Sequence, residues 1–198
     1  MRELLHRNAL VERMLGIEQQ GQSRCRIPHR MEHLQMILPE DLETLSRLEN
    51  LAVSCQPNNL SLDISMIDAC VGPRGKYAYA LKSILNTGVP MCLSSDAPVA
   101  DPNPFAGIYS AVTRKRMNKT PEQGWYPEQA LSVAEAVRAY TLTPAESSGC
   151  GQSLGSITPG KLADLVVADQ NIFEVSPDKI AETKICLTLF DGKIVYER

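Results

Sequence analysis

Two of the chain's three histidines, His29 and His33, lie four residues apart where an apolar segment is expected to end. Neutral imidazole is a common ligand of divalent metals, and a strand end would hold it on rigid backbone facing the mouth of a sheet or barrel. A pair of hydrogen-bonded structural histidines is the competing interpretation. Taken alone, this short segment fits both.

Spacing decides which histidine is the better metal ligand. In a strand the two imidazoles would share a face but lie about 13 Å apart, at roughly 3.3 Å per residue, too far to bind one metal. A helix would allow chelation, but Pro28 before the pair and Pro39 after it leave little room for one. We therefore expect His33 to bind metal, with the other ligands coming from elsewhere, and His29 to be structural.

The composition favours a globular protein of the reducing cytoplasm. Of the 198 residues 43% are hydrophobic, enough for a sizeable core, and the net charge of -3 argues against a nucleic-acid surface. Six cysteines without a C-x-x-C spacing fit reduced, mostly buried thiols. No signal-like start or membrane-length apolar run is present, so we expect neither nucleic acid nor membrane as a partner.

Helical spacings alternate along the chain with short apolar runs typical of buried strands. This repeat is that of parallel α/β architecture, in which crossover helices cover a sheet. The expected strands are at 24–33, 51–55 and 89–94, with helices at 2–20, from Pro39, in a stretch ending near Leu85, and at 105–116.

A polar residue stands at the carboxyl end of each expected strand: His33, Gln56 and Asp96. Ligands of parallel α/β folds bind at this edge of the sheet. Because a polar residue occurs at the carboxyl end of all three expected strands, the three residues together favour a ligand site at this edge more than any one of them does.

The chain divides into residues 1–149, which carry the α/β pattern, and residues 150–198, a small β region. In the first part Ser132 and Glu135 have the spacing of a capping box and predict a helix start. The second part predicts a strand at 165–167 and a hairpin over 184–196 that turns at Asp191 and Gly192.

Three segments together resemble one family: Arg30-x-Glu32-His33, Ser95-Asp96-Ala97-Pro98 and the stretch 155–167. They look like the amidohydrolase superfamily, in the branch that includes N-substituted formamide deformylase-like enzymes. The resemblance runs over nearly the whole chain. Further stretches fit in the same order: Gln56-Pro57, 111–114 and 134–141.

The resemblance implies a metal-dependent hydrolase of carbon-nitrogen bonds in small amide-like substrates, with zinc as the expected metal. Its fold would be a (β/α)₈ TIM barrel with a β-sandwich domain built from both ends of the chain. This sequence would supply barrel strands 6 to 8 and the C-terminal strands of the sandwich. In such enzymes the residue matching His33 ligates metal, and the one matching Asp96 contacts metal and takes the proton of the attacking water.

Other readings of these residues remain open. Asp96 could instead cap the turn after its strand. Glu32 fits a residue that supports the ligands or lies inside the barrel, and Gln56 is a pocket candidate. Arg114 could form an ion pair or touch substrate.

The resemblance also shows what the chain lacks: a His-x-His motif, a bridging lysine and a histidine of the fifth strand. Residues 1–20 resemble the helix after that strand. We therefore expect an incomplete, inactive fragment that binds metal weakly and forms a homo-oligomer or associates with the missing N-terminal half. The rival hypothesis is a non-catalytic scaffold or oligomerisation module derived from such an enzyme.

Overall fold

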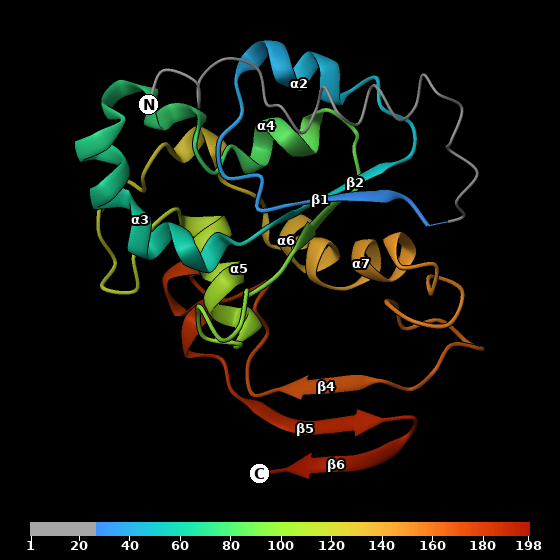
Figure 1. The fold of residues 1–198 in the computed structure, drawn as a ribbon. Helices are drawn as coiled ribbons and strands as arrows, with labels where there is room; N and C mark the ends of the chain where they lie inside the picture. Colours follow the sequence, from blue (N-terminus) through green and yellow to red (C-terminus); the bar gives the residue numbers. More distant parts are fainter. Residues whose placement is uncertain (1–26) are drawn as a thin grey trace.

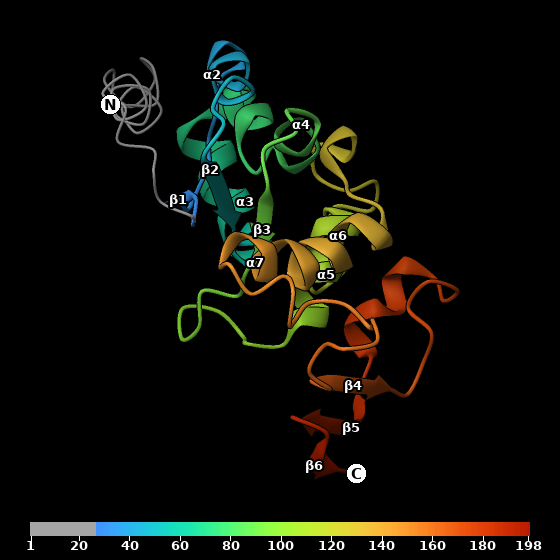
Figure 2. The ribbon, with the colours of Figure 1, turned by 90° about the vertical axis from the view of Figure 1, so that its right-hand side faces the viewer.

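The computed structural model describes residues 27–198, which form two three-stranded sheets joined by helices (Figures 1 and 2). The helix expected at 2–20 and the first residues of the strand expected at 24–33 lie outside this range. The α/β class inferred from the sequence is confirmed, with one parallel and one antiparallel sheet.

The parallel sheet has the order β1-β2-β3. Its strands are β1 (His29–Glu32), β2 (Leu51–Cys55) and β3 (Met91–Leu93). The expected 89–94 strand is shorter than predicted because Pro90 has no amide to donate; its carbonyl still accepts from Val53 N at 2.9 Å. Buried side chains of all three strands join one core, among them Met31, Val53 and Met91.

Helices connect the strands and cover the sheet. Proline opens α2 (Pro39–Leu45) and α3 (Pro57–Cys70), where a missing amide costs nothing. The segment η2 (Gly72–Tyr77) then leads to α4 (Leu81–Asn86). None of the helices within residues 27–198 combines the length and apolar character that crossing a membrane requires.

After β3 the chain forms three further helices, α5 (Pro104–Thr113), α6 (Val133–Tyr140) and α7 (Leu142–Ser147), with the short η3 (Pro127–Gln129) before α6. The predicted capping box at the start of α6 is present. In Figure 1, α2 and α4 lie above the strands and α6 and α7 below them.

The antiparallel sheet consists of β4 (Leu165–Ala168), β5 (Ile185–Phe190) and β6 (Lys193–Glu197). The predicted hairpin is confirmed; Asp191 and Gly192 turn it with φ of 49° and 73°, as a tight two-residue turn requires. Between β4 and β5, η4 (Pro177–Glu182) packs on α5, where Lys115 Nζ lies 3.0 Å from Asp178 Oδ1. The β region is thereby attached to the α/β part.

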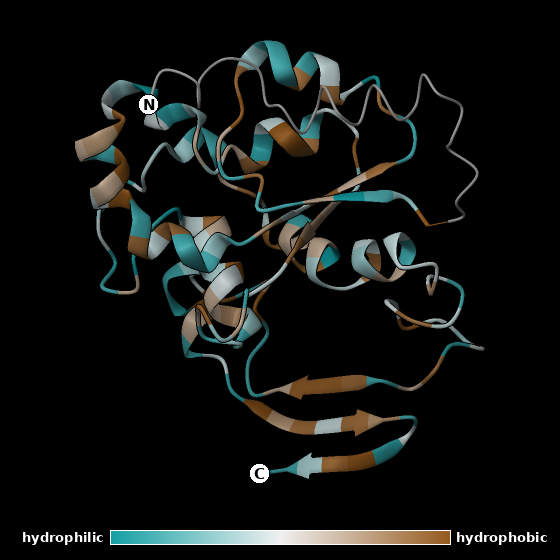
Figure 3. Ribbon diagram, viewed as in Figure 1, coloured by the Kyte–Doolittle hydropathy of each residue, from teal (hydrophilic) through white to brown (hydrophobic). Residues whose placement is uncertain are grey.

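The strands of this second sheet consist largely of hydrophobic residues (Figure 3). Val166, Phe190, Ile194 and Val195 are between 59% and 64% exposed. Sheets normally bury such a surface against a second layer, and none covers it among the described residues.

The expectation of mostly buried cysteines holds for only part of the described set. Cys55 and Cys92 are buried, and burial raises the pKa of the Cys55 thiol to about 12. Cys70 and Cys150 are exposed, because each lies at the end of a helix or in a turn and not in a strand. All five cysteines of the described range are free thiols.

Candidate functional site

His33 and Asp96 lie beside each other at the carboxyl edge of the parallel sheet. Nδ1 of His33 is 3.9 Å from Oδ2 of Asp96, although the two residues follow different outer strands. Both have left-handed backbone conformations, with φ of 56° and 59°. Positive φ is uncommon for residues other than glycine and concentrates at functional sites. The two strongest candidates from the sequence are therefore neighbours in space.

The two side chains are suitable ligands for a metal ion. Their exposed fractions of 52% and 28% leave them accessible from solvent. Two ligand atoms bound to one tetrahedral zinc ion at about 2.1 Å lie about 3.4 Å apart. The two atoms are 3.9 Å apart, so an approach of about half an ångström would let one ion bind both.

Within residues 27–198, no group of three or more His, Cys, Asp and Glu side chains is arranged to hold a metal. His29 begins β1 and is paired with Leu51, whereas His33 follows the other end of that strand. The ring nitrogen Nε2 of His29 is buried without a hydrogen bond. The described part of the chain thus contributes two donors to the candidate site.

Glu32 lies directly before His33 and forms an ion pair with Arg30, with 2.7 Å between Oε1 and Nη2. Both side chains are a little under half exposed. The structure shows Glu32 bound to a neighbour on its own strand, and its part in supporting the ligands stays a prediction.

Gln56 does not line an open pocket, contrary to the expectation from the sequence. It is 2% exposed, and its Nε2 donates to Ser54 Oγ at 3.2 Å and to Ser94 Oγ at 3.1 Å. The side chain was misjudged because a polar residue after a strand usually faces solvent or ligand. Here it joins the ends of β2 and β3.

Arg114 is fully buried, and it forms no ion pair with another residue of the described range. It ends α5 with a φ of 59° and donates to the backbone carbonyls of Tyr79 at 2.9 Å and Trp125 at 3.1 Å. Burial lowers the pKa of its guanidinium to about 10. Both roles inferred for Arg114 from the sequence are therefore replaced by a packing role.

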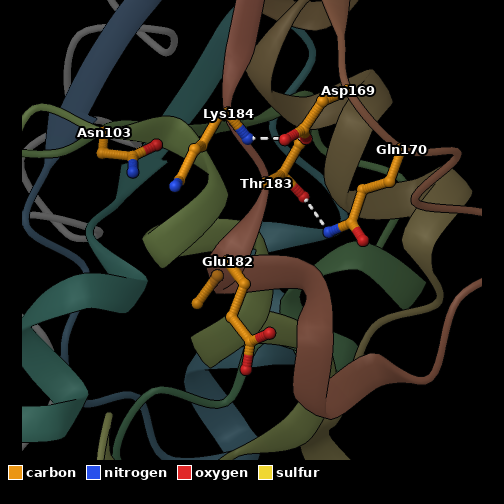
Figure 4. A pocket seen from close by; sticks show the side chains of 7 residues that line it. Asn103, Asp169, Gln170, Glu182, Thr183 and Lys184 are labelled. Carbon is orange, nitrogen blue, oxygen red and sulfur yellow. Dashed lines mark hydrogen bonds between the residues drawn. The ribbon is translucent and has the colours of Figure 1, made fainter.

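A hollow of about 640 Å³ lies between the residue before α5, the turn after β4 and the segment from the end of η4 to the start of β5 (Figure 4). Its polar groups bind one another: Asp169 Oδ1 accepts from Lys184 N at 2.9 Å, and Gln170 Nε2 donates to Thr183 Oγ1 at 2.7 Å. None of the candidate site residues named from the sequence lines this hollow. The lining residues are Asn103, Asp169, Gln170, Ala181, Glu182, Thr183 and Lys184.

Sequence reasoning missed Tyr140 and Gly107. The Tyr140 hydroxyl donates to the carbonyl oxygen of Ser94 at 3.4 Å. A Cβ at Gly107, inside α5, would lie 1.9 Å from that hydroxyl oxygen. The available signal was a glycine in the middle of an otherwise good helix, which often marks a close approach of another group.

Gly107→Ala is expected to destabilise the chain by about 1–3 kcal/mol. Overpacking against Tyr140 costs about 1–3 kcal/mol and the lost hydrogen bond about 1, whereas alanine in a helix regains about 1. Urea unfolding measures the difference. In a Tyr140→Ala background the same change should be neutral or stabilising, and equal stability of Gly107→Ala and the parent would contradict the proposed contact.

The protein-family comparison decides the identity of the chain. Residues 9–196 match the model of the amidohydrolase family. The chain belongs to this family. N-substituted formamide deformylase from Arthrobacter pascens is 35% identical over 120 residues, which cover 61% of this chain and 22% of that protein. Protein LONG AFTER FAR-RED 3 from Arabidopsis thaliana is 34% identical over 170 residues, 84% of this chain and 28% of that protein.

Solved structures show the same fold. An uncharacterized metal-dependent hydrolase from Pyrococcus horikoshii aligns with a TM-score of 0.70 and 24% identity, covering 85% of this amidohydrolase chain and 33% of that chain. The chain therefore spans about a third or less of the length of these relatives.

Proposed function

We propose that this chain is the C-terminal part of a metal-dependent hydrolase that cleaves carbon-nitrogen bonds in small amide-like molecules. In this proposal β1, β2 and β3 are strands 6 to 8 of a (β/α)₈ barrel, and residues 150–198 are the C-terminal strands of a β-sandwich domain. Family membership and the small share of each relative that is covered support it. The observation that carries it is the approach of His33 to Asp96 at 3.9 Å.

His33 and Asp96 would hold the metal, for which zinc is our proposal because imidazole nitrogen and carboxylate oxygen are among its preferred donors. When bound, the metal supplies Lewis acidity, which makes water a nucleophile near neutral pH and polarises a carbonyl. His33 contributes as the neutral imidazole, since only an unprotonated nitrogen can donate its lone pair.

Asp96 has a second task in the proposed reaction. A carboxylate beside the attacking water accepts its proton and can return that proton to the leaving nitrogen, so that the amide is released as an acid and an amine. The 28% exposure of the Asp96 side chain gives water and substrate access to it.

The remaining ligands and the other barrel strands would come from the rest of the parent protein. Three strands cannot close a barrel, and two donors hold a metal weakly. We propose association with the missing N-terminal half, or self-association, in the cytoplasm, and no role for nucleic acid or membranes. A His-x-His segment encoded upstream of Met1 would favour this hydrolase over the rival non-catalytic scaffold.

Cobalt titration of the 198-residue chain, followed by visible absorption, tests the site. We expect weak binding that His33→Ala lowers at least tenfold, since even residues that only support metal ligands contribute about 10–100-fold to affinity. His29→Ala is the matched control and should bind like the parent. Equal affinities of the His33→Ala chain and the parent would refute the assignment, and tight zinc binding with amide hydrolysis by this chain alone would refute its incompleteness.

A further inference from the structure

Ser94 is the residue through which the end of β3 is held, two positions before Asp96. Its amide donates to the Cys55 carbonyl at 3.0 Å. Its hydroxyl accepts from Gln56 Nε2 at 3.1 Å, and its carbonyl accepts from the Tyr140 hydroxyl at 3.4 Å. Ser94 is thus bonded through its amide, its hydroxyl and its carbonyl to β2, to the start of α3 and to the end of α6.

The Gln56 side chain is almost completely buried and is held by hydrogen bonds to neighbouring serines. Its amide group donates to Ser54 Oγ on the preceding strand β2 and to Ser94 Oγ after β3, so the second of these bonds links the ends of the two strands. Its Oε1 is buried with no hydrogen-bond partner within residues 27–198. A buried acceptor without a partner is unfavourable, so this side chain keeps its place at a cost to stability.

Tyr140 reaches Ser94 from the opposite side by passing α5 at Gly107, where the absence of a Cβ leaves room for the phenol ring. Burial raises the pKa of Tyr140, so the hydroxyl keeps its proton and remains a donor. The helix α6, which also packs against β3, thereby contacts the backbone that leads to Asp96.

Asp96 is fixed from its other side by the next turn. Its carbonyl accepts from Val99 N at 2.7 Å, and the Ala97 amide donates to Ser95 Oγ at 3.3 Å. Hydrogen bonds thus hold the backbone on both sides of Asp96, whose φ is 59° and whose carboxylate lies 3.9 Å from His33.

We propose that Gln56 and Tyr140 are positioning residues that hold Asp96 opposite His33 by clamping Ser94. The inference rests on the proposed function only in taking Asp96 as the metal-binding carboxylate. The clamp acts on the Ser94 backbone and makes no contact with the metal or the substrate.

Gln56→Leu and Tyr140→Phe remove the two donors while keeping the size of each side chain. We expect amide hydrogen exchange at Ser94 and Ala97, measured by NMR on the 198-residue chain, to become about tenfold faster in each variant, the effect of losing one hydrogen bond. Exchange at Val53, in the middle of β2, should not change. Tyr109→Phe is the matched control, because it removes another tyrosine hydroxyl bound to a backbone carbonyl, that of Arg116 at 3.1 Å.

Cobalt affinity is the second readout, which a purely structural role would leave unmoved. Gln56→Leu and Tyr140→Phe should each weaken Co²⁺ binding about tenfold, the lower range for residues that orient metal ligands, and Tyr109→Phe should not. Unchanged exchange at Ser94 and Ala97 in Tyr140→Phe overturns the clamp, whether or not Gln56→Leu folds. If neither the parent chain nor any variant binds Co²⁺, the proposed metal site of this chain is refuted. The exchange rates at Ser94 and Ala97 still test whether Gln56 and Tyr140 hold Ser94.

Discussion

Asp96→Asn in the full-length parent protein is expected to lower kcat for amide hydrolysis about a thousandfold, within the range that a positioned general base contributes. Asparagine has nearly the same shape but cannot accept the proton of the attacking water. It also removes the negative charge opposite His33, 3.9 Å away, and so weakens the proposed metal site. The measurement is kcat and KM with zinc at saturation, so that weaker metal binding and lost proton transfer can be separated.

Asp101→Asn is the matched control for this prediction. Asp101 lies in the same connection after β3, and its Oδ1 accepts from Asn103 N at 2.8 Å, which an asparagine oxygen can also do. That variant should retain activity. An Asp96→Asn protein with normal kcat and normal zinc content would show that another group takes the proton.

Arg114→Met is expected to destabilise the chain by about 3 kcal/mol. The change leaves the buried carbonyl of Trp125 without a donor, at about 1–3 kcal/mol. It also removes the charged donor of the Tyr79 carbonyl, a bond worth about 1.5–3 kcal/mol, although the Leu81 amide still donates to that carbonyl at 2.8 Å. Part of this is offset because the buried guanidinium, whose pKa burial lowers to about 10, no longer has to be kept charged away from water. The midpoint and slope of urea unfolding give the change in free energy.

Arg47→Met provides the comparison for Arg114, because Arg47 is 69% exposed and pairs with Glu43 on the surface of α2. An exposed ion pair is worth little, so we expect a change within about 0.5 kcal/mol. If both variants lost the same stability, the burial of Arg114 would not be the cause.

Features set by neighbouring residues could be predicted from the sequence. The capping box of Ser132 and Glu135 and the turn at Asp191 and Gly192 depend on local chemistry, and both are present. The strand ends carrying His33 and Asp96 were also correctly placed, because alternating strands and helices imply a parallel sheet whose carboxyl ends meet.

Features set by distant residues could not be predicted in this way. The role of Arg114 depends on Tyr79, 35 residues away, and that of Tyr140 on Ser94, 46 residues away. Nothing within a few residues of either side chain indicates that it is buried against a backbone carbonyl. Gln56 was correctly singled out at the end of its strand, but it was expected to face a pocket, whereas its side chain is buried and binds Ser94, 38 residues away.

The charged residues at the two ends of the outermost strand, β6, affect the direction in which a second strand could pair with it. Its three central residues are apolar and exposed, and they lie between Lys193 and Glu197. Parallel stacking in register would place lysine on lysine and glutamate on glutamate, which repels, and this is the arrangement of many amyloid fibrils. An antiparallel neighbour would instead place lysine opposite glutamate. The charges of β6 therefore disfavour a parallel neighbour in register and favour an antiparallel one.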